Sequence, residues 1–290
     1  MGEHLDRARP FLGRDTSGLL EGGRYALLHS RSLEFDDLRP YVAGDDVRDI
    51  DWKASARSGH VLIKRFVSEK HHKILLVVDA GRNGTGLAPS GEVKRDVAAN
   101  AIGAIGLITL RRSDEIGMVF GDARGCVDIR LRRGETHVEY LLHRFYEHTS
   151  ARPGRSDIVT QLSWVASHYR RRLLLVVVSD EPEVTDPLRD VLGRLTSTHD
   201  VLWAMLSDMP AATSAQDEVD GYDVGTGGFV PCGATLGAGI VTAYQRAEAV
   251  RRERLSETLT ANGVSHAAID GSAGIRAAIA EMTGVLARAR

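Results

Sequence analysis

The chain has 290 residues, of which 43% are hydrophobic and 26% are charged, and its formal net charge is -2 at pH 7. This composition is typical of a globular protein with one large domain or two modest ones. A nucleic-acid-binding surface needs clustered excess positive charge, which this balance does not favour.

The sequence contains no signal for secretion or for a membrane span. The first twelve residues carry charges and no apolar core, unlike a signal peptide. The longest apolar runs, 74–78 and 173–178, are far shorter than the roughly 20 residues that a membrane-spanning helix needs. The two cysteines, Cys126 and Cys232, have neither metal-ligand spacing nor a disulfide framework. We therefore expect a cytoplasmic protein.

Three zones follow one another along the chain. Residues 1–32 are polar and broken by glycines, which predicts an irregular or helical arm. Residues 33–70 are dense in acids, arginines and aromatic residues, and we expect them to pack on the main domain. Residues 71–290 alternate between strand and helix patterns and predict one α/β domain.

The strands of the third zone are continuous apolar runs, which indicates a sheet that helices cover on both faces. The clearest runs are Lys73–Asp79, Arg172–Asp180 and His199–Leu206. Further strands are expected at Val61–Val67, Glu115–Phe120, Cys126–Leu131 and Val264–Ile269.

Apolar residues at helical spacing predict helices between these strands. They are expected at Glu92–Leu110, Thr136–Tyr146, Asp157–Tyr169, Pro187–Thr196 and Thr242–Thr260, with a last apolar stripe from Ile275 to Leu286. This alternation predicts a mostly parallel, Rossmann-like sheet with right-handed crossovers.

Polar side chains gather where these strands end, which is where open α/β sheets bind ligands. Asp79 and Asn83 follow one strand, Asp180 follows another, and Ser156 precedes a helix. Such hard oxygen donors suit Mg²⁺. The same residues can instead serve structure, with Ser156 and Asp157 as helix caps and the other acids bonding loop amides.

Two other kinds of site are poorly supported. The glycines of Gly81–Gly86 follow a strand and could cradle a pyrophosphate, but their spacing is wrong for a dinucleotide loop. The sequence has no G-x-S-x-G nucleophile elbow, and its 11 histidines are scattered.

The stretch from Leu33 to Arg57 mixes acids with basic and aromatic residues at close spacing. We expect ion pairs there, with Phe35, Tyr41 and Trp52 anchoring them onto a core. The segment is either a structural cover for one sheet edge or a docking surface. The candidate docking residues are Glu34, Phe35, Arg39, Tyr41, Asp45, Asp46, Arg48, Asp51, Trp52 and Lys53.

The segment from Leu33 to Phe66, continued into the strand that ends at Asp79, closely resembles the signature of the family called domain of unknown function 58. This resemblance implies a von Willebrand A-like domain that often occurs with AAA+ ATPases of the MoxR type. It further implies a role in chaperone-like assembly or metal insertion.

The resemblance also implies a metal motif, D-x-S-x-S followed by a later Thr and a later Asp. Asp79 and Asp180 match its two acids, whereas Gly81 and Asn83 stand at its two serines and Ser156 replaces its Thr. One hydroxyl is lost and one becomes an amide, so we expect Mg²⁺ to be held weakly or not at all.

These observations favour a non-enzymatic adaptor with a protein partner, a MoxR-type ATPase. One alternative is a divalent-metal hydrolase that uses Asp79, Asp180 and a bound water. Another is a structural scaffold in which the strand-end acids only cap loops. The glycine-rich piece Gly221–Gly239 suggests a hairpin and loop and has no assigned role.

Overall fold

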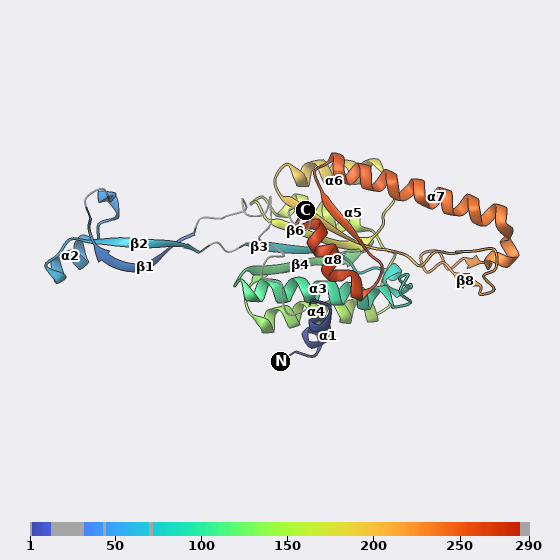
Figure 1. Cartoon of the computed structure of the whole chain (residues 1–290), viewed down its shortest axis with the longest axis horizontal. Coiled ribbons are helices and arrows are strands. Elements are labelled where there is room, and N and C mark those ends of the chain that lie inside the picture. The colour runs from blue at the N-terminus through green and yellow to red at the C-terminus, as the bar shows by residue number, and fades with distance from the viewer. Residues whose placement is uncertain (1, 13–31, 43–44, 70–71, 285–290) are drawn as a thin grey trace. The chain divides into compact units, whose positions relative to one another are not determined.

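The computed structural model describes residues 2–12, 32–42, 45–69 and 72–284. The chain divides into two compact units (Figure 1). The larger unit combines Met1–Leu28 with Lys73–Arg290, and the smaller one is His29–His72. Within the expected arm, the described residues 2–12 group with the α/β unit.

A six-stranded sheet forms the centre of the larger unit, in the order β10-β7-β6-β3-β4-β5. The first five of these are parallel, and β5 pairs antiparallel with β4. The strands are β3 (Lys73–Asp79), β4 (Glu115–Asp122), β5 (Gly125–Arg132), β6 (Leu174–Asp180), β7 (Asp200–Leu206) and β10 (Ser265–Ile269). The predicted mostly parallel α/β fold is confirmed.

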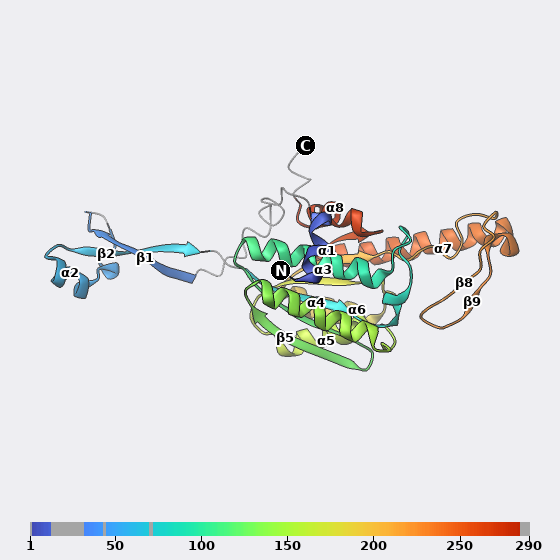
Figure 2. The same cartoon turned by 90° about the horizontal axis from the view of Figure 1, so that it is seen from below.

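Helices cover both faces of this sheet, as the continuous apolar strands require. In β3, Leu76 and Val78 join one core cluster, whereas Leu75 and Val77 join the other. The first cluster lies under α1 (Glu3–Leu12), α3 (Lys94–Arg111), α4 (Glu135–Ser150) and α8 (Ile275–Met282). The second lies under α5 (Ile158–His168), α6 (Asp186–Thr196) and the end of α7 (Gly233–Ala261). Figure 2 shows the first helix layer from below.

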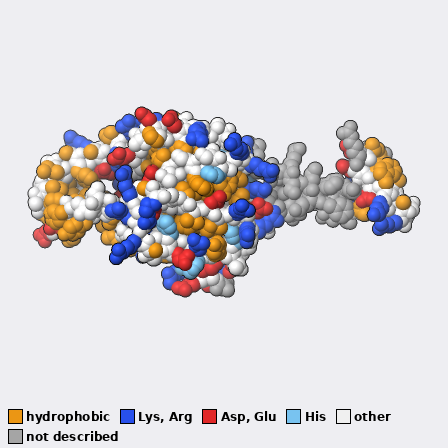
Figure 3. Space-filling model, turned by 180° about the vertical axis from the view of Figure 1, so that it is seen from behind, with side chains coloured by type: hydrophobic (Ala, Val, Ile, Leu, Met, Phe, Trp, Pro, Cys, Tyr) orange, Lys and Arg blue, Asp and Glu red, His pale blue; other side chains and the backbone are white. Residues whose placement is uncertain are grey.

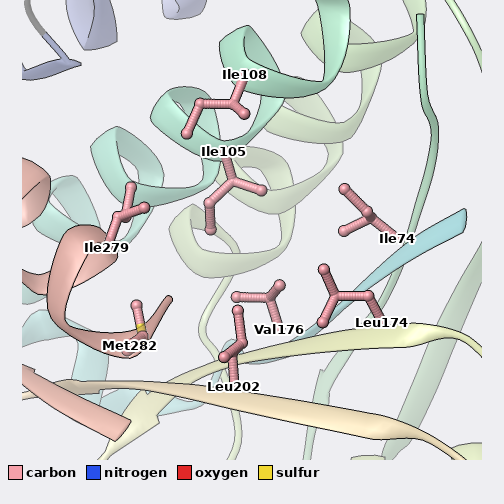
Figure 4. A pocket seen from close by; sticks show the side chains of 8 residues that line it. All are labelled: Ile74, Ile105, Ile108, Leu174, Val176, Leu202, Ile279 and Met282. Atoms are coloured by element: carbon pink, nitrogen blue, oxygen red, sulfur yellow. The ribbon is translucent and has the colours of Figure 1, made fainter. Parts of the chain in front are cut away.

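The first face encloses a small apolar void between the sheet and α3 and α8 (Figure 4). Ile105 and Ile108 line it from α3, Ile279 and Met282 from α8, and Val176 from β6. Purely apolar linings give a water molecule no hydrogen-bond partner, so this void is part of the hydrophobic core.

Helix α7 is longer than the predicted Thr242–Thr260 helix. It contains a kink at Gly237, whose φ of 78° is in the left-handed region that favours glycine. Its buried side chains include Val241, Leu255 and Leu259, and most of the intervening surface is exposed. The first turns of α7, residues 233–241, contain Gly233, Gly237 and Gly239, and glycines favour a loop over a helix in a sequence pattern, which is why the predicted helix began too late.

The smaller unit consists of a hairpin and two short helices. Its elements are β1 (Ser32–Pro40), η2 (Val47–Asp49), α2 (Trp52–Ser58) and β2 (Leu62–Glu69), with β1 and β2 antiparallel. The Asp51 carboxylate accepts the Lys53 and Ala54 N–H groups and so caps α2. Gly59, with φ of 77°, ends the helix.

Helix α1 packs on α3 at a position that only glycine allows. A Cβ on Gly103 would lie 2.4 Å from the Cβ of Ala8, which real Cβ atoms do not tolerate. Leu5, Ala8 and Leu12 are buried in this contact. The absent side chain on Gly103 therefore lets the two helices approach closely.

We predict that Gly103→Ala lowers the free energy of unfolding by about 1–2 kcal/mol, because α1 must move away from α3. Urea denaturation measures the change. Gly193→Ala is the matched control, since that exposed glycine of α6 has nothing near its Cβ position. The control should stabilise by about 0.5–1 kcal/mol. A stabilising Gly103→Ala would contradict the close packing of α1.

Candidate functional site

An aspartate lies at the carboxyl end of each of the parallel strands, at one edge of the sheet. Asp79, Asp122 and Asp180 are the last residues of β3, β4 and β6, whereas Asp208 and Asp270 come shortly after β7 and β10. This edge is where parallel α/β sheets carry their sites. The sequence-based interpretation used only the first and third of these acids.

The Asp79 carboxylate forms hydrogen bonds with residues of two neighbouring loops. The Gly81 N–H donates to Asp79 Oδ1 at 2.8 Å, and the Ser156 side chain also hydrogen-bonds this carboxylate. The Asn83 N–H in turn donates to Ser156 Oγ at 3.2 Å. The structure thus brings together the predicted residues Asp79, Asn83 and Ser156, with Ser156 as a bridge between two loops.

Burial raises the pKa of Asp79 to about 7, and the neighbouring Asp180 adds to the rise. The Gly81 N–H and the Ser156 hydroxyl oppose it. A carboxyl with such a pKa is partly protonated at neutral pH. Asp79 is therefore a weaker cation ligand than an ordinary aspartate.

Gly81 stands at the first serine of the family motif, and the fold requires a glycine there. A Cβ on Gly81 would lie 2.4 Å from both Cα and Oγ of Ser156. The loop that carries Ser156 is held close by a 2.8 Å hydrogen bond from the Arg82 N–H to the Gly154 carbonyl. The missing hydroxyl is thus replaced by a close contact between two backbones.

Asp122 fixes that second loop. Its carboxylate accepts the Gly154 N–H at 2.7 Å and pairs with the Arg124 guanidinium at 2.6 Å. The Arg124 contact holds the pKa of Asp122 well below its usual range. The neighbouring helix α5 is capped by Asp157, whose carboxylate accepts the Val159 N–H, so Ser156 is not the cap.

A lysine occupies the centre of the edge. Lys94, the first residue of α3, is fully buried, and its Nζ lies 2.6 Å from Asp180 Oδ1 and also contacts Asp208 Oδ1. Burial opposes the charged form of Lys94, but the two carboxylates outweigh it and raise the pKa of the lysine. The ammonium therefore stays charged and links the ends of β6 and β7.

The sequence contains a signal for Lys94 that the pattern analysis did not use. Val97 and Ala98 lie three and four positions further along α3 on its buried side, so Lys94 falls on an otherwise apolar face. It also places a positive charge at the helix N-terminus, where the macrodipole disfavours it. A lysine with both disadvantages needs partners of negative charge.

Asp180 has two different environments for its oxygens. Oδ1 pairs with Lys94, whereas Oδ2 is buried and has no hydrogen-bond partner of good geometry in the part of the chain that is described. Burial raises the pKa of Asp180, while Lys94 and the Asn83 side chain oppose the rise. Asn83 thus connects Asp180 to the Asp79 loop.

The glycine-rich piece Gly221–Gly239 begins with a small hairpin against this edge. Strands β8 (Gly221–Tyr222) and β9 (Phe229–Val230) pair antiparallel, and the tip between them is closed by hydrogen bonds to Asp223. A Cβ on Gly225 would lie 3.2 Å from Asn83 Oδ1, so the tip reaches the Asp79 loop. The exposed Tyr222 and Phe229 rings meet edge to face at 5.7 Å.

The four predicted metal ligands lie near one another, but the donor set does not fit a divalent cation. The Lys94 ammonium holds Asp180, Ser156 bonds both Asp79 and the Asn83 N–H, and Asp79 is partly protonated. Within residues 2–12, 32–42, 45–69 and 72–284, no three His, Cys, Asp or Glu side chains are grouped to hold a metal.

The candidate docking residues lie in the smaller unit. Arg39 forms a bidentate pair with Asp45 at 2.6 and 2.8 Å, as the ion-pair expectation required. Trp52 is 68% exposed, so no described residue of the smaller unit buries it. Ile50 and Ile63, by contrast, are buried and form a β-bridge.

The other candidates are distributed around this segment. Asp51 caps α2, and Tyr41 is half-buried. Asp46 and Lys53 are exposed. The side chains of Glu34, Phe35 and Arg48 lie outside the described part of the structure. The expected packing of the segment on the α/β unit stays a prediction.

A family model described as protein of unknown function DUF58 matches residues 37–214. The chain belongs to this family. The match covers most of the signature segment and the sheet as far as β7. The strand order is that of a doubly wound α/β sheet, which agrees with the expected von Willebrand A-like architecture. The predicted family and fold are confirmed.

Curated relatives include uncharacterized proteins from Mycobacterium tuberculosis and Mycobacterium bovis. Each is 26% identical over 189 residues, which is 64% of this chain and 58% of the relative. The chain thus spans less than two thirds of the length of the curated relatives that it matches.

Solved structures of similar fold include a von Willebrand factor type A protein from Catenulispora acidiphila. It is 11% identical, with a TM-score of 0.42, and the match covers 77% of this chain and 43% of that one. Another is an aerotolerance-related membrane protein from Bacteroides fragilis, at 12% identity and a TM-score of 0.47, covering 73% of this chain and 98% of that one.

The expected cytoplasmic location is corrected by this comparison, because a neighbour in fold is described as a membrane protein. Among the described helices none is both long and apolar enough to cross a membrane. The short apolar runs of these residues form the hydrophobic core, and their length does not determine where the protein resides.

Asp79 gives a prediction on pH. The folded state keeps its proton up to about pH 7, whereas the unfolded chain loses it near 3.8, so the stability that this group contributes falls as pH rises between these values. Asp79→Asn removes the ionisation and keeps an oxygen for the Gly81 N–H. We expect the variant to be more stable than the native protein by about 2 kcal/mol at pH 8 and nearly equal at pH 4.

Urea denaturation across this range measures the effect, and Asp122→Asn is a control of opposite sign. Because the pKa of Asp122 is lowered, its stabilising contribution is present above the unfolded value of 3.8 and is lost as pH falls below it. Asp122→Asn should therefore destabilise at neutral pH. Equal pH profiles for Asp79→Asn and the native chain would show that Asp79 is ionised in both states.

Gly81 gives a prediction on the altered motif. Gly81→Ser restores the family residue, but its Cβ meets the backbone of Ser156, so we expect a loss of about 1–3 kcal/mol in unfolding free energy. Gly84→Ser, whose Cβ would be 3.8 Å from Arg95 Cβ, should be close to neutral. Unchanged stability in Gly81→Ser, together with a gain of Mg²⁺ binding in calorimetric titration, would contradict the close contact between Gly81 and Ser156.

Proposed function

We propose that this chain is a non-enzymatic interaction protein that works with a MoxR-type AAA+ ATPase in the assembly or maturation of a client protein. Its von Willebrand A-like fold and its family support a protein-interaction role in general. The class of partner rests on the family resemblance of the Leu33–Phe66 segment. The exposed Trp52 on that segment is the observation that carries the proposal.

Trp52 lies in a short stretch with other exposed apolar side chains. Trp52 is 68% exposed, and Val42 and Val47 are each 61% exposed. Figure 3 shows hydrophobic side chains on the surface of the smaller unit, with basic side chains beside them. Exposed tryptophan is unfavourable in water and is enriched among residues that dominate the affinity of protein interfaces.

The charged residues of the segment support a docking surface in a second way. Arg39 and Asp45 bind each other and shape the loop that carries Val42, whose N–H also bonds Asp45. Exposed Asp46 and Lys53 offer charges to a partner around the apolar residues. A central aromatic residue inside a polar rim is the usual anatomy of an interface.

The arrangement at the strand ends favours an interaction protein over the hydrolase alternative. A hydrolase of the kind considered above would use Asp180 to hold or activate a reacting group. Here Asp180 is neutralised by Lys94, and Asp79 is held by the Gly81 N–H and Ser156. These contacts favour structural roles for the two acids.

We predict that the full chain binds a MoxR-type ATPase of its own organism, and that Trp52→Ala weakens this binding by about 30-fold or more, as expected of a central aromatic residue. Calorimetry with the ATPase in its ATP and ADP states measures the affinity. A circular dichroism spectrum of the variant checks that the hairpin unit is still folded.

Tyr222→Ala is the matched control, because this aromatic residue is similarly exposed but lies on β8 of the other unit. It should leave the affinity unchanged. Absence of binding in both nucleotide states would reject the partner. An effect of Tyr222→Ala but not of Trp52→Ala would show that the docking surface is the β8–β9 hairpin and not the smaller unit. Phosphatase turnover that Asp180→Asn abolishes would contradict the non-enzymatic role.

A further inference from the structure

The buried ammonium of Lys94 lies where the strand-end acids would otherwise need an external cation. Lys94 has no exposed side-chain surface, and its Nζ contacts carboxylates from two different strand ends, Asp180 and Asp208. The backbone N–H of the same residue donates to the Gly86 carbonyl at 2.9 Å, which fixes the start of α3 next to the Asp79 loop. The cation is therefore supplied by the chain and positioned by its fold.

The position of Lys94 demands a compensating role. A lysine in the apolar interior loses its hydration, and at a helix N-terminus it also meets the positive end of the helix dipole. The Asp180 carboxylate would likewise be unfavourable at this edge without a cation, because burial disfavours its charged form. The lysine and the two aspartates thus stabilise one another, and removing either side leaves an uncompensated charge.

Asp180 is the acid that matches the last metal ligand of the family motif. One of its oxygens is taken by Lys94 at 2.6 Å. A divalent ion that bound the other oxygen would lie within a few ångström of a fixed positive charge in a poorly hydrated site. The repulsion between the two cations is strong in such surroundings, so the ammonium and a metal ion compete for the same carboxylate.

We propose that the Lys94 ammonium is a built-in substitute for the divalent cation of this fold, so that the strand-end site is complete without metal and becomes a metal site only when the lysine charge is removed. Asp79, Asn83, Asp180 and Asp208 then supply oxygen donors of the kind that Mg²⁺ and Mn²⁺ bind. This inference does not depend on the identity of any partner.

The test compares the native chain with Lys94→Met, which keeps an apolar stem and removes the charge. Mn²⁺ is the probe, followed by electron paramagnetic resonance of the free ion and by thermal unfolding with Mn²⁺ or with a chelator. The native protein should bind no Mn²⁺ at this edge at millimolar concentration and should have the same Tm in both conditions. Lys94→Met should have a lower Tm in chelator, bind Mn²⁺ at least about tenfold more tightly than the native chain, and regain Tm with the ion.

Two further variants assign the effect. Lys94→Met combined with Asp180→Asn should lose the Mn²⁺ binding, which places the ion at the strand ends. Lys73→Met removes a partly exposed lysine that pairs with Glu115 at 3.8 Å and should change neither Tm response nor Mn²⁺ binding.

The proposal is overturned if the native chain binds Mn²⁺ and loses it in Asp79→Ala, because the site then accepts metal beside the lysine. It is also overturned if folded Lys94→Met gains no Mn²⁺ binding. The native-chain titration decides the matter alone if Lys94→Met fails to fold, since that measurement needs no lysine variant.

Discussion

The structure depends on keeping a row of carboxylates at one edge of a parallel sheet whose two faces are covered by helices. Parallel strands bring all their carboxyl ends to the same side, and here an aspartate lies at each of these ends. Such acids are stable in partly buried positions only when hydrogen bonds or cations compensate them. The loops around the edge are built to supply these partners.

The compensation is of three kinds. Asp122 uses a surface arginine and backbone N–H groups, Asp180 and Asp208 share the Lys94 ammonium, and Asp79 has the Gly81 N–H and the Ser156 hydroxyl. Burial and the neighbouring Asp180 raise the pKa of Asp79 to about 7 in spite of these two hydrogen bonds. The edge thus combines a well-compensated frame with one acid that is close to its titration point at neutral pH.

The two units differ in what they bury and what they expose. The α/β unit is held by two apolar clusters on opposite faces of the sheet, and its strand ends are closed by internal contacts. The hairpin unit is small and exposes Trp52 and neighbouring valines. In the proposed function the larger unit provides a rigid body and the smaller one provides the contact to a partner.

Local sequence patterns are enough to predict the sheet and most of its helices, because apolar runs and helical spacing follow directly from which residues are buried. It also determined the family, and it located Asp79, Asn83, Ser156 and Asp180 at one edge. It did not reveal the helix α1 contact, the length of α7 or the exposure of Trp52. Those features depend on which surfaces other segments cover.

The contacts of the strand-end residues could not be predicted from local patterns, because they form between segments that are distant in the sequence. The sequence showed Gly81 as a lost ligand, whereas the fold shows a close approach to Ser156 that no side chain permits. The sequence-based expectations gave Lys94 no role, whereas the fold buries it between Asp180 and Asp208. Both carboxylate partners of Lys94 lie more than 80 residues away along the chain, and only folding brings these segments together.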